Sequence, residues 1–297
     1  MTTEQSDTDV TDVADVTDEQ PVGGTAAEAE PVPEVPPRRT LTPHLAAALR
    51  WTAAVAVFAV VGAGTAYGIT RADRTDVPGL ATESDGRWTF PELTRPPLPS
   101  GSPSPYASAN KAGAHYADLR RLVVPAPAGA KADAALRGTD GWLPTKTFLA
   151  EYKPGNDIYS RGGVEQILTD YGLRHIAARG WTTGDGTHTR VYLLQFETAA
   201  VVDELSTGKL VSYVSPPQTL TGTDTLVRDE TFPDRANVDN VQRTAYVEPK
   251  PYGTEHVRAA FLSAGDTLAL VVQSRKGAVV GEVPFQQTVV LQSELLG

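Results

Sequence analysis

The chain of 297 residues contains no cysteine and a single methionine. The absence of cysteine excludes disulfides, thiolate zinc sites, iron–sulfur clusters, a cysteine nucleophile and a lipid-modified cysteine. The sequence also lacks G-x-S-x-G, H-E-x-x-H, Walker A and G-x-G-x-x-G, the motifs of serine hydrolases, zinc proteases and nucleotide-binding proteins. We therefore predict a protein that is not an enzyme, with no catalytic residue, no cofactor and no metal.

Residues 1–37 lack lysine, arginine and aromatic side chains, and they hold ten acidic residues. The net charge of −10 belongs to this segment, because the rest of the chain carries 26 acids and 26 bases. Such a balance does not indicate a nucleic-acid-binding surface. An acidic segment of this kind buries too little surface to offset its ordering entropy, so we expect residues 1–44 to form a disordered tail. Thr8, Thr11 and Thr17 lie beside acids and are candidate phosphoacceptors; the alternative is a solvated leader without a partner.

A run of twenty residues without a charge, Trp51 to Thr70, is the strongest signal in the sequence. An α-helix that rises about 1.5 Å per residue needs roughly 20 residues to cross a hydrocarbon core of about 30 Å. Trp51 and Tyr67 lie near the two ends, where amphipathic rings suit the headgroup layer. We expect a transmembrane helix over residues 45–70 that anchors the chain in the lipid bilayer. A buried soluble helix and a cleaved signal peptide are the alternatives.

The orientation of this helix is not decided by its flanking charges, because three arginines precede it and three follow it closely. A large block of sequence follows the helix, as expected when an N-terminal anchor starts the export of what comes after it. We therefore expect a single-pass protein of the cell membrane with a cytoplasmic N-terminus and an extracytoplasmic C-terminal domain. Residues 71–108, with six prolines between Pro91 and Pro105, are expected to be an extended spacer.

Residues 109–297 are long enough to bury a core and are expected to form one extracytoplasmic domain. Apolar spacing and turn residues predict helices over 143–152, 160–171 and 198–205, and a last helix near Pro284. Strands are predicted over 173–181, 189–196, 241–247, 256–262 and 267–273. A hairpin followed by a helix therefore occurs twice. The order predicts an α+β fold, a mostly antiparallel sheet with helices on one side.

Few residues of the body indicate a site. Trp142, Trp181 and Tyr252 are candidates for a ligand or partner surface, and the alternative for each is packing in the core. Ser206 and Lys209 have the S-x-x-K spacing of penicillin-binding proteins, but the partner motifs S-D-N and K-T-G are missing. The five histidines have no spacing typical of metal ligands.

Two strings carry a resemblance: ADLRRLVVPAPAGAKAD at residues 117–133 and TDYGLRHIAARGWTTGDGTHTRVYLLQF at residues 169–196. With them, the sequence resembles uncharacterised single-pass membrane proteins of high-GC actinobacteria. An excess of arginine over lysine, 19 against 7, agrees with such a source. No activity is attached to that group, so the resemblance implies the layout of anchor, spacer and body and assigns no functional residue.

Three hypotheses of function follow from the sequence. The leading one is a bitopic membrane protein that presents a non-enzymatic binding domain to the cell envelope, with an envelope protein or wall polymer as partner. The second is an envelope hydrolase or transferase with an unfamiliar site. The third is a signalling adaptor that recruits a cytoplasmic partner through its acidic tail. The oligomeric state is not indicated.

Overall fold

The computed structural model describes residues 42–71 and 84–297, which fall into two units. The first unit holds helix α1 (Pro43–Arg71). Within α1, Ala47–Gly68 is the one described helix long and apolar enough to cross a membrane. The hydroxyls of Thr52 and Thr65 donate to the carbonyls of Ala48 and Val61, at 2.8 Å each, so neither hydroxyl lacks an acceptor. This helix is consistent with a single-pass protein, whereas its orientation stays a prediction.

Residues 1–41 of the expected acidic tail lie outside the described residues, and this stretch includes Thr8, Thr11 and Thr17.

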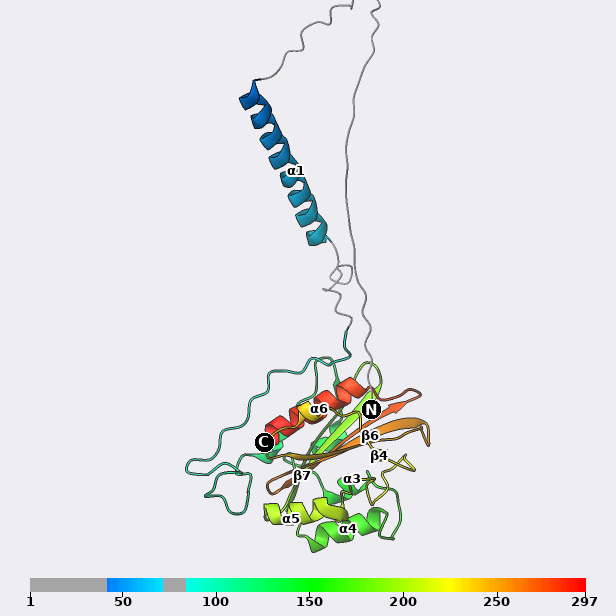
Figure 1. The fold of residues 1–297 in the computed structure, drawn as a ribbon. Helices are drawn as coiled ribbons and strands as arrows, with labels where there is room; N and C mark the ends of the chain where they lie inside the picture. Colours follow the sequence, from blue (N-terminus) through cyan, green and yellow to red (C-terminus); the bar gives the residue numbers. More distant parts are fainter. Residues whose placement is uncertain (1–41, 72–83) are drawn as a thin grey trace, which may run out of the picture. The chain divides into compact units, whose positions relative to one another are not determined.

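The second unit is built on a seven-stranded antiparallel sheet, as Figure 1 shows. The spatial order is β1-β2-β3-β7-β6-β5-β4, and the prediction of an α+β fold with an antiparallel sheet is confirmed. The hairpins β2–β3 and β6–β7 turn through Gly186 and Gly265, both at positive φ. The strands are β1 (Lys131–Ala132), β2 (His175–Thr182), β3 (Thr187–Gln195), β4 (Val227–Arg228), β5 (Gln242–Val247), β6 (Glu255–Ala264) and β7 (Thr267–Lys276).

Short helices connect these strands, and one longer helix ends the chain. Ser160 precedes α4, but its hydroxyl donates to the carbonyl of Asp157 at 2.8 Å instead of capping the helix. Gly172, at a φ of 67°, follows the same helix. The helices are α2 (Leu119–Leu122), α3 (Thr145–Leu149), α4 (Arg161–Asp170), α5 (Ala199–Glu204) and α6 (Glu282–Leu296), with 3-10 turns η2 (Ala134–Arg137) and η4 (Asp234–Ala236) and a π-turn η3 (Leu205–Lys209).

Helices cover both faces of the sheet, which corrects the expectation of helices on one side (Figure 1). The helices α3, α4 and α5 pack on one face, and α2 and α6 pack on the other. The physical reason lies in the central strands. Phe261 and Leu270 point into the first core while Leu262 and Val271 point into the second. A strand that is apolar at successive positions has to be covered on both faces.

The two hairpin–helix units do not repeat in space. They meet where β3 pairs antiparallel with β7 at the centre of the sheet. A two-fold axis perpendicular to the sheet at this point would place the helix that follows each hairpin on the same face. Instead, Val202 of α5 packs on one face and Val289 of α6 packs on the other. The repeat in the order of elements is therefore not a structural duplication.

The second part of the expected spacer lies against the body. The backbone N–H of Trp88 donates to Oε1 of Gln287 at 2.8 Å, and Nε2 of Gln287 donates to the carbonyl of Trp88 at 2.9 Å. Arg95 donates through Nε to the carbonyl of Glu294 at 2.8 Å. Phe90 packs into the core under α6. Phe90 and Leu93 are partly buried against the core, so this stretch is attached to the body, and the bounds of the expected spacer, 71–108, stay a prediction.

Candidate functional site

A pocket of about 280 Å³, here called the edge pocket, opens where the edge of the sheet is interrupted. Strand β1 pairs only with Trp181 and Thr182 of β2 before the chain leaves the sheet as η2. The chain returns at Leu143, whose N–H donates to the carbonyl of Ile176 at 2.8 Å. Residues 178–180 of β2 therefore lie between these two contacts and form the floor of the pocket.

Gly180 and Asp133 position η2 beside β2. A Cβ atom at Gly180 would lie 2.6 Å from Cδ1 of Leu136 and 3.1 Å from Cβ of Asp133, so glycine lets η2 approach β2 without a shift of these side chains. The Asp133 N–H donates to the Gly180 carbonyl at 2.8 Å, and Asp133 Oδ1 caps η2 by accepting from the N–H of Ala135 at 2.9 Å. Oδ2 of Asp133 lies 3.0 Å from Nε2 of His188. Both oxygens of the one acidic residue that lines the pocket are therefore engaged.

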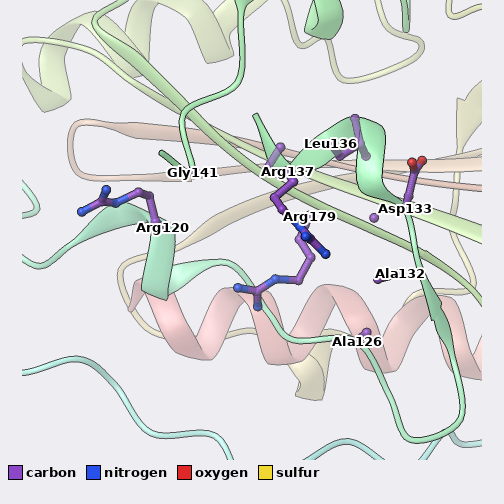
Figure 2. Close-up of a pocket in the computed structure, with 10 residues that line it drawn as sticks. Arg120, Ala126, Ala132, Asp133, Leu136, Arg137, Gly141 and Arg179 are labelled. Atoms are coloured by element: carbon purple, nitrogen blue, oxygen red, sulfur yellow. The ribbon is translucent and has the colours of Figure 1, made fainter. Parts of the chain in front are cut away.

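Three arginines line the edge pocket, and Figure 2 shows Arg137 and Arg179 at its centre. Arg179 is half-buried, and its one hydrogen bond to a described residue runs from Nη1 to the carbonyl of Val123 at 2.7 Å. Burial lowers the pKa of the Arg179 guanidinium, since desolvation disfavours its charge. Arg137 is exposed and has no ion pair within the described part of the chain. Arg120 differs, because its Nε and Nη2 donate to Asp118 at 2.8 and 2.9 Å.

A second, more open hollow of about 730 Å³, here called the Trp142 hollow, shares Arg120 with the edge pocket. The indole of Trp142 stacks on the imidazole of His175, with ring centroids 4.6 Å apart and an interplanar angle of 29°. The guanidinium carbon of Arg120 lies 5.1 Å from the centroid of the Trp142 ring. Arg174 also lines this hollow. The two hollows together hold four arginines near an aromatic stack, and two of these arginines, Arg120 and Arg174, are paired with Asp118 and Glu197.

The three aromatic residues singled out in the sequence do not come together. Trp142 is half-buried and lines the hollow named after it. Trp181 is fully buried in the core beneath α6, with the Phe90 ring edge-on at 6.4 Å, so its assignment to a surface is corrected to core packing. Tyr252 is 65% exposed, and its backbone N–H donates to Oε1 of Glu248 at 3.0 Å. It lines neither hollow.

The S-x-x-K string and the histidines occupy other places. The Ser206 hydroxyl donates to the carbonyl of Val202 at 2.7 Å and lies 2.5 Å from the hydroxyl of Ser263, while Lys209 is exposed. This arrangement places the serine in the turn after α5 and does not pair it with the lysine. No group of three or more histidine, aspartate or glutamate side chains that could hold a metal occurs within residues 42–71 and 84–297.

Arg137 and Arg179 were not among the residues predicted from the sequence. One signal for Arg179 was present, because it stands between the apolar residues Ala177 and Trp181 on one face of β2. Arg137 carried no signal, since its position beside Arg179 depends on the departure of the chain from the sheet at η2.

Comparison with known proteins assigns no family to this chain. No protein-family model matches it, and no curated protein matches it. Function is therefore argued from the geometry of the two hollows.

Proposed function

We propose that the chain is a single-pass membrane protein whose α+β body is a non-enzymatic binding module of the cell envelope. In this proposal the N-terminus is cytoplasmic and the body lies outside the membrane. The observation that carries it is the junction of the edge pocket and the Trp142 hollow at Arg120. Cations and an aromatic side chain on one surface are the groups that commonly carry binding energy at interfaces.

The surface at this junction is held in place before a ligand arrives. Arg120 is fixed by Asp118 and by the carbonyl of Asp140, which accepts from Nη1 at 2.9 Å. Trp142 is fixed by its stack with His175 and by backbone hydrogen bonds with Thr139 in both directions, at 2.9 and 3.0 Å. A preorganised surface loses less conformational entropy on binding, which favours a role in binding.

The expected orientation is tested by cysteine labelling, which the natural absence of cysteine makes unambiguous. Thr11→Cys marks the N-terminal tail, and Ser100→Cys marks an exposed position of the segment that precedes the body. A membrane-impermeant maleimide applied to intact cells should label the Ser100→Cys protein alone. Labelling of the Thr11→Cys protein alone would overturn the proposed envelope location.

The binding role is tested by co-sedimentation of the full chain, in an uncharged detergent, with insoluble cell-wall material. We expect the wild-type chain to sediment and the Trp142→Ala chain to lose at least about fivefold in affinity, because truncation of a central aromatic contact commonly costs more than about 1 kcal/mol. Tyr252→Ala is the matched control, since it removes an exposed aromatic residue away from both hollows. Equal sedimentation of the two variants, or no sedimentation of the wild type, would overturn the proposal.

A further inference from the structure

We infer that the edge pocket binds a phosphate group, held between the guanidinium groups of Arg137 and Arg179. The inference rests on the proposed binding role and names the chemistry of the ligand at one part of that surface. The phosphate is either free or esterified in a larger molecule, and both sources present the same oxygens to the two arginines.

The pocket holds more positive than negative charge. Arg137 and Arg179 line it without a carboxylate within ion-pair distance among the described residues. Asp133 is the one acid in the lining, and its oxygens accept from Ala135 and face His188. A half-buried guanidinium that gives one hydrogen bond to a carbonyl retains most of its five N–H donors for another acceptor. The pocket therefore presents unused donors and an excess of positive charge over its one carboxylate to a ligand.

Two guanidinium groups can match the charge and shape of a tetrahedral anion. A carboxylate carries one negative charge on two oxygens in a plane, so it balances the charge of one arginine. Inorganic phosphate and a phosphate monoester offer at least three terminal oxygens and up to two negative charges, which two forks can engage together. A diester carries one charge, and it differs from a carboxylate in the tetrahedral arrangement of its oxygens.

The size and construction of the pocket suit a small ligand. Its volume of about 280 Å³ lies just below the range of about 300–1,000 Å³ typical of small-molecule sites, which suits a phosphate with a small substituent. Its walls come from β2, η2 and the turn at Gly141, where a Cβ atom would lie 2.8 Å from Cδ of Arg120. Gly141 has a φ of 82°, which favours glycine at the position that Arg120 passes over.

The test is isothermal titration calorimetry on the full chain in an uncharged, phosphate-free alkyl maltoside at constant ionic strength. The probes are inorganic phosphate, the diester glycerophosphoglycerol and, for comparison, acetate. We expect saturable binding of at least one phosphate probe, and affinity lowered about tenfold or more by Arg137→Gln and by Arg179→Gln, since each removes a charge-assisted contact. Arg121→Gln is the matched control, because Arg121 is exposed on α2 and does not line the pocket.

The probes separate the sources of phosphate. Tighter binding of glycerophosphoglycerol would indicate a lipid headgroup or another ester, and tighter binding of inorganic phosphate would indicate the free ion. Arg137 is exposed, so its variant keeps the test valid if Arg179→Gln does not fold.

Absence of saturable phosphate binding, equal binding of acetate, or binding unchanged in the Arg137→Gln chain would overturn the inference. Retained sedimentation with wall material in that case would leave the proposed binding role standing, so the two failures are distinguishable.

Discussion

The carboxylate of Asp266 and the imidazole of His115 form a buried pair, with Oδ1 and Nδ1 2.8 Å apart. Asp266 Oδ1 also accepts from the backbone N–H of His115 at 3.1 Å, and its Oδ2 accepts from Gln195 at 3.0 Å. Nε2 of His115 faces the carbonyl of Leu296 at 3.1 Å. The pair therefore joins the β6–β7 turn to the end of β3, the end of α6 and the segment that precedes α2.

This geometry predicts how stability depends on acid. Burial disfavours the charge of Asp266, but the hydrogen bonds from His115 and Gln195 outweigh it and hold the pKa of Asp266 below its usual 3.8. A carboxyl with a lowered folded pKa stabilises the protein above its unfolded pKa, and this contribution is lost as pH falls through the folded pKa. Asp266→Asn should lower the free energy of unfolding by about 3 kcal/mol at pH 7, because it breaks a buried pair.

The measurement is urea unfolding of the full chain in uncharged detergent at pH 7 and at pH values below 3.8. The difference in the free energy of unfolding between the wild type and Asp266→Asn should be smaller below pH 3.8 than at pH 7. Asp224→Asn, at an exposed position, should match the wild type at both pH values. A difference of the same size at both pH values would contradict the link between the ionisation of Asp266 and the stability of the protein.

His256 predicts a second pH dependence in a higher window. Burial lowers the pKa of this imidazole below 6.5, and its Nδ1 accepts from the N–H of Val280 at 3.2 Å while its Nε2 lies 2.9 Å from the carbonyl of Glu248. The unfolded chain therefore takes up a proton at a higher pH than the folded chain does. The stabilisation is complete above about pH 6.5 and is lost as pH falls below it.

The variant His256→Asn should remove this loss below about pH 6.5 and should cost about 1–2 kcal/mol at pH 7.5, through the hydrogen bonds it weakens. Thermal unfolding at these pH values measures both effects. His175→Gln, at an exposed histidine, serves as the comparison and should keep the pH dependence of the wild type. If the stability of His256→Asn depended on pH as that of the wild type does, another group would titrate in this pH range.

Gln287 predicts how firmly the segment before the body is attached to α6. Its amide exchanges two hydrogen bonds with the backbone of Trp88, so Gln287→Ala should lower stability by about 1–2 kcal/mol. Hydrogen exchange at residues 88–90 should become faster, because the N–H of Trp88 loses its acceptor. Gln286→Ala is the control on the same helix, since Gln286 bonds to Thr231 and Glu282 instead. Equal exchange in the two variants would argue against this attachment.

The sequence predicted the five longer strands because local signals determined them, and it missed the two-residue strands β1 and β4. Gly186 and Gly265 identify the two hairpin turns, and apolar runs of strand length flank both turns. The helix after Ser160 was found from its apolar face, and Gly172 marked its end. Each of these signals lies within about ten residues of the element that it predicts.

What the sequence could not predict depends on contacts between distant residues. The faces covered by α5 and α6 follow from the path of the chain, although the unbroken apolar stretch of β7 was a sign that both faces are buried. The attachment of Trp88 to Gln287 spans 199 residues, and a proline-rich composition conceals it. Arg137 and Arg179 line the same pocket because β1 is only two residues long and the chain leaves the sheet as η2.

Trp181 gives the sharpest contrast between a buried and an exposed aromatic residue. Its ring is fully buried, so Trp181→Ala should lower the free energy of unfolding by about 3–5 kcal/mol, while Tyr252→Ala should change it by less than about 0.5 kcal/mol. The indole Nε1 has no hydrogen-bond partner among the described residues. Trp181→Phe removes this unpaired donor and keeps most of the apolar volume, so it should cost much less than the alanine variant. Urea unfolding of the three variants measures the series, and an equal cost for phenylalanine and alanine would contradict the view that a six-membered ring restores most of the packing at this position.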